Sequence, residues 1–549
     1  MKFLRIATNS LISGFFFCLL LALLVADLNI NLVLKPFILV KLAAFLMLSY
    51  GLFISLLCAF IYTIYRFISG KKNKIGFVSP SFLVMSFSLL TLLFLLIFRE
   101  NFVYFYAFFV PGLQSLLKIQ MMALFVLAVA GLFLYYKHRQ GPKPLYFRLY
   151  FALLVFILSL TLIQRLNYPP PQKSYRLAGL ETKKIEKKVT ILGLDGLSLD
   201  LILPLANERK IPNFSWLMEG GSWGHLESLT PNDPFILHHS FNTGKFPGKH
   251  HRISDVRYGI PGLDSVVEVV PRFILFRQLK RVGLLKIFPN EALHPAKDIW
   301  KIFENDQASF LKKDIPLLEN AAVKPDPKTE KAFNIFYKDL QSETSKIFGL
   351  VKQAFVRDSE SEEKASQQKT EVQPQLFSLF LNGLNTTETY FYKYNFPEAF
   401  GEIKQDEIQK FGPVIEKYYQ FYDQIIGKYL AALKENELLV VYSPHGIEPL
   451  PFWKRLVEWI LGNSEVSAYH EQAPDGAFFF YGNGIAKGKN VDSLRLVDVM
   501  PALLYYLGLP VGKDMDGIVR SALFTKEFTE ENPLFYISSY EDVNFRRLK

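Results

Sequence analysis

Long apolar runs lie almost entirely before residue 165 of the 549-residue chain, and the remainder mixes apolar and charged positions as globular sequences do. A helix needs about 20 apolar residues to cross the hydrocarbon core of a bilayer. Five segments meet that length, at about 9–28, 38–65, 77–98, 116–136 and 146–164. The aromatic stretch 101–113 is broken by Pro111 and is predicted to be interfacial rather than a sixth span. The pattern predicts a transmembrane domain of five helices over residues 1–165.

Lys and Arg gather in three of the stretches beside these runs and are scarce in the other two, near 29–37 and 99–115. The basic positions are Lys2 and Arg5 before the first run, Arg66, Lys71, Lys72 and Lys74 after the second, and Lys137, Arg139, Lys143 and Arg148 between the fourth and the fifth. Because cytoplasmic loops carry the excess of Lys and Arg, these three places are predicted to be cytoplasmic. No A-x-A site follows the first run, so it is expected to remain a membrane helix. Five crossings then place everything after residue 165 in the periplasmic or extracellular space, outside a plasma or bacterial inner membrane.

Charged residues are nearly absent inside the runs, and the main exception, Lys41, is close enough to an end to reach the membrane surface. This scarcity argues against an ion pathway, so the membrane domain is expected to be an anchor or a platform for a lipid-linked substrate. Basic cytoplasmic loops explain the formal net charge of +11, and no basic stripe with interleaved aromatics predicts a nucleic-acid partner. Both cysteines, Cys18 and Cys58, lie in apolar runs. The exported region has no cysteine, which fits an oxidising compartment.

The exported region alternates apolar strand-like runs with helical stretches, which predicts an α/β sandwich. It follows a polar linker over 166–188, and a charged, nearly apolar-free stretch near 357–374 is predicted to be a flexible surface insertion. The strand-like runs are VTILGLDG (189–196), ELLVVYSPHG (437–446) and GAFFFYGNG (476–484), with a helical stretch at 411–434. Sites in such sheets form at the carboxyl ends of strands. Asp195 and His445 occupy that position after two of the runs.

The stretch PFWKRLVEWILGN (451–463) is amphipathic and carries Trp453 and Trp459. Such a stretch packs its apolar face into the core of the domain in many proteins. It is also typical of a helix that contacts a membrane surface or a lipid substrate. The sequence leaves both interpretations open.

Six motifs occur in order over about 189–520 and resemble the type I phosphodiesterase and nucleotide pyrophosphatase branch of the alkaline phosphatase superfamily. They are ILGLDGLSLD with IPNFSWLMEGG, TGKFPGKHHRISD, GLNTTETYFYKYNFPEAF, SPHG, AYHEQAPDGAFFFYGNGI and VDVMPALLYYLGLPVGKDMDG. The resemblance implies an alkaline-phosphatase-like fold for residues 189–549. It also implies two divalent metals, usually zinc, on either side of a Thr or Ser nucleophile that attacks a phosphodiester.

The resemblance assigns the family's metal ligands to particular positions of this chain. Three positions keep a ligand residue: Asp195, His445 and His470. Three others do not, because Asn385, Thr389 and Pro444 supply neither a carboxylate nor an imidazole. A catalytic metal normally has at least three protein ligands, so the implied two-metal scheme is incomplete. Zinc or manganese stays possible only if one site survives.

The family's nucleophile position falls on Pro234, or on Asp233 if one gap is allowed, and neither residue carries a hydroxyl. Substitute ligands or bases in the right segments are Asp233, His238, His239 and Glu388. A sulfatase-like nucleophile derived from cysteine is excluded, because the exported region has no cysteine. The phosphoethanolamine and glycerol-phosphate transferases are similar in having about five spans before an exported phosphatase-like domain, and this analogy keeps a lipid-linked substrate in view.

Two interpretations follow. The first is a membrane-anchored, catalytically degenerate protein that acts as a binding or regulatory module in the cell envelope, where it binds an envelope protein or a phosphorylated or lipid-linked ligand. The second is a divergent hydrolase or phosphotransferase that acts on an envelope or lipid-linked phosphodiester with one metal and an unconventional nucleophile, such as Asp233 or water.

Overall fold

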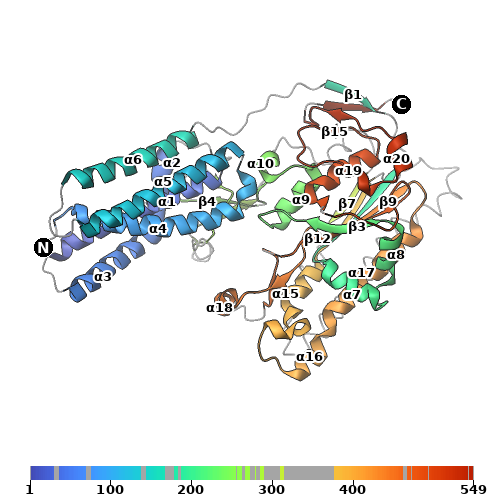
Figure 1. The fold of residues 1–549 in the computed structure, drawn as a ribbon, viewed down its shortest axis with the longest axis horizontal. Coiled ribbons are helices and arrows are strands. Elements are labelled where there is room, and N and C mark those ends of the chain that lie inside the picture. Colours follow the sequence, from blue (N-terminus) through green and yellow to red (C-terminus); the bar gives the residue numbers. More distant parts are fainter. Residues whose placement is uncertain are drawn as a thin grey trace. The chain divides into compact units, whose positions relative to one another are not determined.

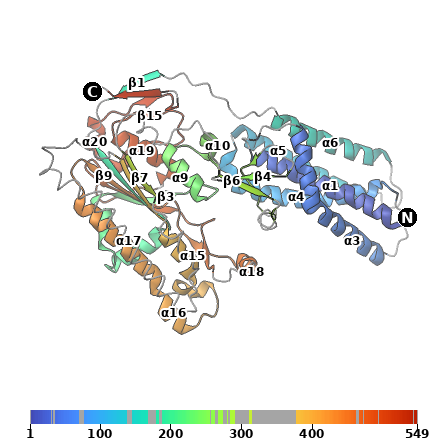
Figure 2. The same cartoon turned by 180° about the vertical axis from the view of Figure 1, so that it is seen from behind.

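The chain divides into two compact units in a computed structural model (Figures 1 and 2). The structure describes residues 2–29, 32, 36–69, 76–109, 111–137, 144–166, 178–182, 187–254, 256–261, 266–272, 279, 283, 285–289, 310–314, 376–460, 466–471, 473–492, 494–541 and 543–547. The membrane unit comprises Met1–Ser174 and Pro247–His294, and the sheet domain comprises Tyr175–Phe246 and Pro295–Lys549. The predicted insertion near 357–374, most of the linker at 166–188 and the basic residues at 71–74, 139 and 143 lie outside the described residues.

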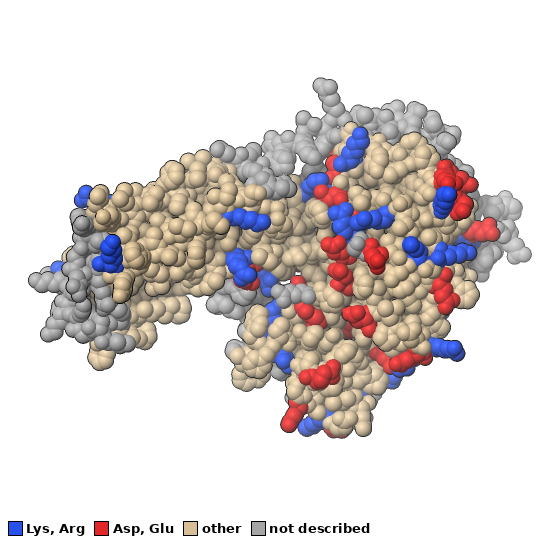
Figure 3. Space-filling view, in the orientation of Figure 1, with Lys and Arg blue, Asp and Glu red and all other residues tan. Residues whose placement is uncertain are grey.

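In the part of the membrane unit that the structure describes, five helices are long and apolar enough to cross a membrane, which confirms the predicted number of spans. They are α1 (Lys2–Leu28), α2 (Pro36–Leu46) continued through a π-turn (Met47–Gly51) into α3 (Leu52–Ser69), α4 (Pro80–Tyr104), α5 (Pro111–Lys137) and α6 (Pro144–Leu166). The aromatic stretch forms the end of α4, a 3-10 turn (Tyr106–Phe108) and the start of α5, so it adds no further span. On the face shown in Figure 3, these helices are almost free of charged side chains between their ends. Basic and acidic side chains are both scattered over the sheet domain.

Polar side chains at the helix ends hold the membrane unit together. The Arg165 guanidinium, in a residue that is 5% exposed, donates to the Ala26, Asn29 and Leu32 carbonyls at 2.8–3.0 Å. The last turn of a helix leaves its carbonyls without partners, so a buried arginine can satisfy them. This arginine follows the last of the five apolar runs directly.

Two asparagines pair with the backbone of the segment 268–272, which follows the TGKFPGKHH motif. Asn29 accepts hydrogen bonds from the Glu268 and Val269 amides at 2.8 and 2.7 Å and donates to the Val269 carbonyl at 2.8 Å. Asn101 accepts from the Arg272 amide at 2.7 Å and donates to its carbonyl at 3.1 Å. A carboxamide carries both a donor and an acceptor. Each asparagine side chain can therefore make the pair of backbone hydrogen bonds that a neighbouring strand would otherwise make. This is why Pro247–His294 belongs to the membrane unit. Its elements are α10 (Pro247–His250) and a three-stranded sheet of β5 (Val266–Val267), β4 (Val256–Gly259) and β6 (Lys286–Pro289).

The sheet domain is built on a mixed eight-stranded sheet in the order β13-β3-β12-β9-β2-β8-β7, with β14 also paired to β3. The strands are β2 (Lys188–Leu194), β3 (Ser222–Glu227), β7 (Phe310–Asp314), β8 (Leu376–Leu381), β9 (Glu437–Tyr442), β12 (Gly476–Gly482), β13 (Lys489–Asn490) and β14 (Leu494–Arg495). β9, β2, β8 and β7 run parallel, and β12 runs antiparallel to β9 and to β3. The three strand-like runs of the sequence are therefore adjacent strands at the centre of the sheet.

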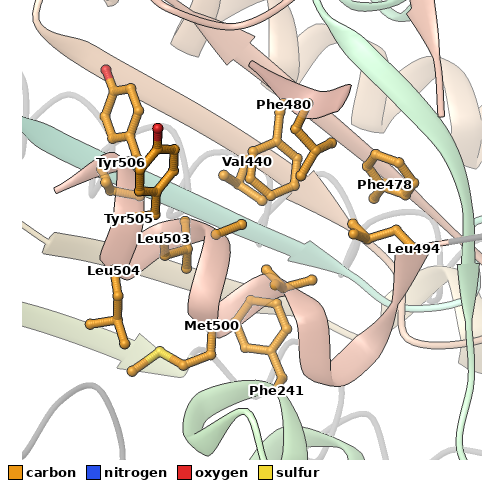
Figure 4. Close-up of a cluster of buried hydrophobic side chains, with 14 of the residues drawn as sticks. Phe241, Val440, Phe478, Phe480, Leu494, Met500, Leu503, Leu504, Tyr505 and Tyr506 are labelled. Carbon is orange, nitrogen blue, oxygen red and sulfur yellow. The ribbon is translucent and has the colours of Figure 1, made fainter. Parts of the chain in front are cut away.

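Both faces of the sheet are covered by helices, which explains the continuous apolar character of the central strands. Leu439 and Val441 of β9 pack on one face with α7 (Leu199–Asn207), α8 (Pro212–Gly220), α15 (Gly383–Asn395) and α17 (Pro413–Ala432). Val440 packs on the other face with α9 (Pro234–Thr243), α19 (Val499–Tyr506) and α20 (Lys526–Glu531), as Figure 4 shows in part. The alternation follows the period of two along a strand. The predicted α/β sandwich is confirmed.

The remaining elements are short. They are α16 (Gln405–Phe411), α18 (Phe452–Ile460), the hairpin pair β10 (Glu448–Pro449) and β11 (Ala468–Tyr469), the pair β15 (Val511–Gly512) and β16 (Tyr536–Ile537), the pair β1 (Ala178–Thr182) and β17 (Val543–Arg547), and the 3-10 turns Pro397–Ala399, Leu496–Asp498 and Ser521–Leu523. The β10–β11 hairpin lies directly after the strand end that carries His445, and it carries α18.

Candidate functional site

Asp195 and His445 meet at the carboxyl ends of two neighbouring parallel strands, as predicted from their positions in the sequence. Asp195 follows β2, His445 follows β9, and the two strands pair in register over Lys188–Gly193. The residues are 2% and 0% exposed, and His445 Nε2 lies 3.1 Å from Asp195 Oδ1. The two atoms are close but are not aligned for a hydrogen bond, so each is left without a hydrogen-bond partner.

A tight turn fixes the orientation of His445. Its Nδ1 lies 2.9 Å from the Gly446 carbonyl, and Ser443 Oγ donates to the His445 carbonyl at 2.7 Å while accepting from the Gly196 amide at 3.0 Å. Because a carbonyl can only accept, Nδ1 carries a proton. Nε2 is therefore the ring nitrogen that faces the Asp195 carboxylate.

The helix α15 presents the residues at the predicted lost ligand positions. Asn385 donates from Nδ2 to Asp195 Oδ2 at 3.0 Å, so it contacts the carboxylate as a donor and not as a second anion. Thr389 turns away and donates to the Asn385 carbonyl at 2.8 Å. A side chain at Gly196 would lie 2.9 Å from the Asn385 amide nitrogen, and Gly196 has a φ of 96°, so glycine is required for this close approach.

Glu388, one of the possible substitute ligands, is completely buried beside this pair. Burial raises its pKa well above the usual range, and the charge of Asp195 raises it further, whereas a contact from the Tyr419 hydroxyl at 3.5 Å opposes this shift. The raised pKa favours the protonated form of Glu388, which binds a metal less readily than a carboxylate does. No pattern in the sequence pointed to Tyr419, because it is 31 residues away on another helix.

His470, the third retained ligand position, follows β11 and stacks on His445. Their ring centroids are 4.9 Å apart and the rings are inclined by 22°. The pKa of His470 is lowered to about 4, mainly by burial and to a smaller extent by the neighbouring His445, whereas the Asp195 and Glu471 carboxylates oppose the shift. His470 is thus neutral at pH 7.

The segment at the predicted nucleophile position forms the start of α9. Pro234 is the first residue of this helix, and Asp233 caps it by accepting hydrogen bonds from the Phe235 and Ile236 amides at 3.0 and 3.4 Å. Asp and Pro are favoured at these two positions for the helix alone. His238 contacts Asn242 at 2.8 Å, and the ring of His239 packs against Phe235. Asp233 and Pro234 form the start of α9, and neither supplies a hydroxyl.

Two other family motifs are joined by a buried ion pair and a hydrogen bond. Lys245 of TGKFPG is 5% exposed and pairs with Asp514 of KDMDG at 2.6 Å and with Glu541 at 2.7 Å. Burial opposes ionisation of Asp514, but the Lys245 ammonium outweighs it and lowers the pKa of this carboxyl. The Phe246 amide also donates to Asp516 at 2.8 Å. These contacts join the TGKFPG and KDMDG motifs to each other.

The residues present do not fit the two-metal centre that the resemblance implies. Across the part of the chain that the structure describes, no group of three or more His, Cys, Asp or Glu side chains could hold a metal ion. Four buried atoms near the pair have no hydrogen-bond partner: Asp195 Oδ1, Asn385 Oδ1, Glu388 Oε2 and His445 Nε2. Asp195, Glu388 and His445 are of residue types that zinc takes, but their side chains are not arranged as a group that could hold an ion.

A comparison with protein families agrees with this arrangement of elements. The model for type I phosphodiesterase / nucleotide pyrophosphatase matches residues 189–464, about half of the chain. The match runs from β2 to just beyond α18 and includes Asp195, Asn385 and His445. No curated protein matches the chain.

Proposed function

The chain belongs to the type I phosphodiesterase and nucleotide pyrophosphatase family, and we propose that it is a catalytically degenerate member that binds its ligand without hydrolysing it. Five membrane helices make it an integral membrane protein. The proposed role is that of a binding or regulatory module of the cell envelope. Its partner would be an envelope protein, or a phosphorylated or lipid-linked molecule.

One contact carries the proposal. The Asn385 amide donates to Asp195 Oδ2 at 3.0 Å, at a position where the family pattern has a carboxylate. An aspartate facing Asp195 at this distance would need a cation between the two, because like charges at hydrogen-bond distance repel strongly in a buried site. The amide removes that need. With Pro234 at the nucleophile position, both the metal requirement and the attacking hydroxyl are lost together.

A second candidate function rests on the four buried atoms that have no hydrogen-bond partner. They surround Asp195, and a protein rarely leaves buried polar atoms unsatisfied without a reason. A divergent hydrolase or phosphotransferase would use them to bind one zinc or manganese ion. Water or Asp233 would then have to be the nucleophile.

The metal content of the purified protein separates the two candidates. For the full chain, extracted in detergent and dialysed against trace zinc and manganese, elemental analysis is expected to find far less than one metal ion per chain. Stoichiometric metal that is lost in His445→Ala, and retained in a control His225→Ala, would support the divergent enzyme instead. His225 suits the control because it lies exposed on β3.

We also propose that the sheet domain lies outside the cytoplasm. Support comes from the positions of Lys and Arg around the spans, because cytoplasmic loops carry their excess. Protease added to sealed spheroplasts is expected to digest the sheet domain and to spare a tag at the N-terminus. Protection of the sheet domain, with loss of the tag, would reverse the proposed orientation.

A further inference from the structure

The helix α18 is amphipathic, but its apolar face points to solvent and its charged face points to the sheet domain, the opposite of a helix that packs on a core. Four of its apolar side chains face away from the sheet domain, with Phe452 75%, Trp453 52%, Leu456 49% and Trp459 66% exposed. Its charged residues Lys454, Arg455 and Glu458 are partly buried instead. The core-packing interpretation of this stretch is therefore wrong for these four side chains, which we call the apolar face of α18.

Charged contacts fix the helix in this orientation. Lys454 pairs with Glu471 at 2.7 Å and lies 3.8 Å from the centre of the Tyr469 ring, and Arg455 lies 4.9 Å from the centre of the Phe400 ring. The hairpin beneath the helix is held by β10–β11 pairing. Turning the apolar face inward would break each of these contacts. The exposure of two tryptophans, a phenylalanine and a leucine is thus built into the fold.

A bilayer is the surface that suits such a face on this chain. Phe, Trp and Leu on one side of a short helix, with Lys and Arg on the other, are typical of helices that lie in the membrane interface. The protein is already attached to a bilayer, because five of its helices are long and apolar enough to cross one. Only 21 residues separate the end of α6 from the start of β2, and they span about 70 Å at most when fully extended.

We propose that α18 lies in the interface of the bilayer that the same chain spans, with its apolar face at the boundary between headgroups and acyl chains. A helix of nine residues would bind a membrane weakly by itself. Attachment to the membrane helices makes the contact intramolecular, so that weak partition is enough. The hairpin that carries α18 also leads to His470, so this contact brings that edge of the candidate site to the lipid headgroups.

Tryptophan fluorescence can test the contact in the intact protein. All five tryptophans of the chain, at positions 216, 223, 300, 453 and 459, lie outside the membrane helices. Brominated acyl chains quench a tryptophan only at close range, so quenching in proteoliposomes reports on the part of the protein outside the spans. The full chain is reconstituted in phosphatidylcholine with and without bromine on the acyl chains.

The double variant Trp453→Phe/Trp459→Phe is compared with Trp216→Phe. Trp216 is a matched control, since it is 61% exposed and lies on α8. The wild type and the control are expected to be quenched, and the double variant is expected to lose at least half of the bromine-dependent quenching. Each single variant should lose part of it, which covers a double variant that fails to fold. Equal quenching in all variants, or none in the wild type, would overturn the proposal, the second result favouring a protein partner.

Discussion

The change Asn385→Asp is expected to destabilise the sheet domain when a chelator is present and to create a response to zinc that the wild type lacks. The introduced carboxylate would lie about 3 Å from Asp195 Oδ2, where the amide now donates a hydrogen bond. Two buried carboxylates at this distance repel each other when both are ionised. The expected loss in the free energy of unfolding is therefore about 2–3 kcal/mol. Zinc would bridge the two carboxylates and His445, which together reach the minimum of three protein ligands.

Thermal unfolding of the detergent-solubilised full chain, with chelator and with added zinc, measures this effect. A ligand that binds only the folded state at a hundred times its dissociation constant adds about 2.7 kcal/mol, which would restore the loss. The control Asn385→Leu removes the hydrogen bond without adding a charge. It should cost about 1–2 kcal/mol and show no response to zinc. A zinc response in the control or in the wild type, or none in Asn385→Asp, would contradict the account of the lost metal site.

The central strands and the candidate pair were predictable because each depends on a local pattern. Strands buried on both faces have to be apolar throughout, so ILGL and LLVVY indicate the middle of a sheet from sequence alone. A polar residue directly after such a strand lies at the edge where parallel strands end together. Asp195 and His445 satisfy that rule, and the structure places them 3.1 Å apart.

The packing of 268–272 in the membrane unit was not predictable, because it depends on single asparagines. Asn29 is separated from Val269 by 240 positions, and Asn101 from Arg272 by 171. A carboxamide that replaces a strand neighbour leaves no periodic signal in the sequence. The contact between Glu388 and Tyr419 was missed for the same reason.

The orientation of α18 shows a different limit. The apolar positions correctly predicted an amphipathic helix, but amphipathicity gives a face and not its direction. The direction depends on Lys454 meeting Glu471 and on Arg455 meeting Phe400, which are tertiary contacts. Only the structure could distinguish a helix that covers a core from one that presents tryptophans outward.

The second large expected effect follows from the proposed degeneracy: we expect the protein not to hydrolyse phosphodiesters. The family chemistry needs a hydroxyl that a metal activates for attack at phosphorus. Here the position holds Pro234, and the neighbouring Asp233 carboxylate is bound to the amides at the start of α9. Asp195 is already contacted by Asn385 and His445. These residues therefore supply neither an activated nucleophile nor the ligands for two metal ions that would stabilise the leaving oxygen.

The most direct measurement is the hydrolysis of bis(4-nitrophenyl) phosphate by the purified full chain with zinc or manganese, beside Asp195→Ala prepared in the same way. The account predicts that the two proteins release nitrophenol at the same rate, equal to that of the protein-free solution. Turnover by the wild type that disappears in Asp195→Ala would contradict it.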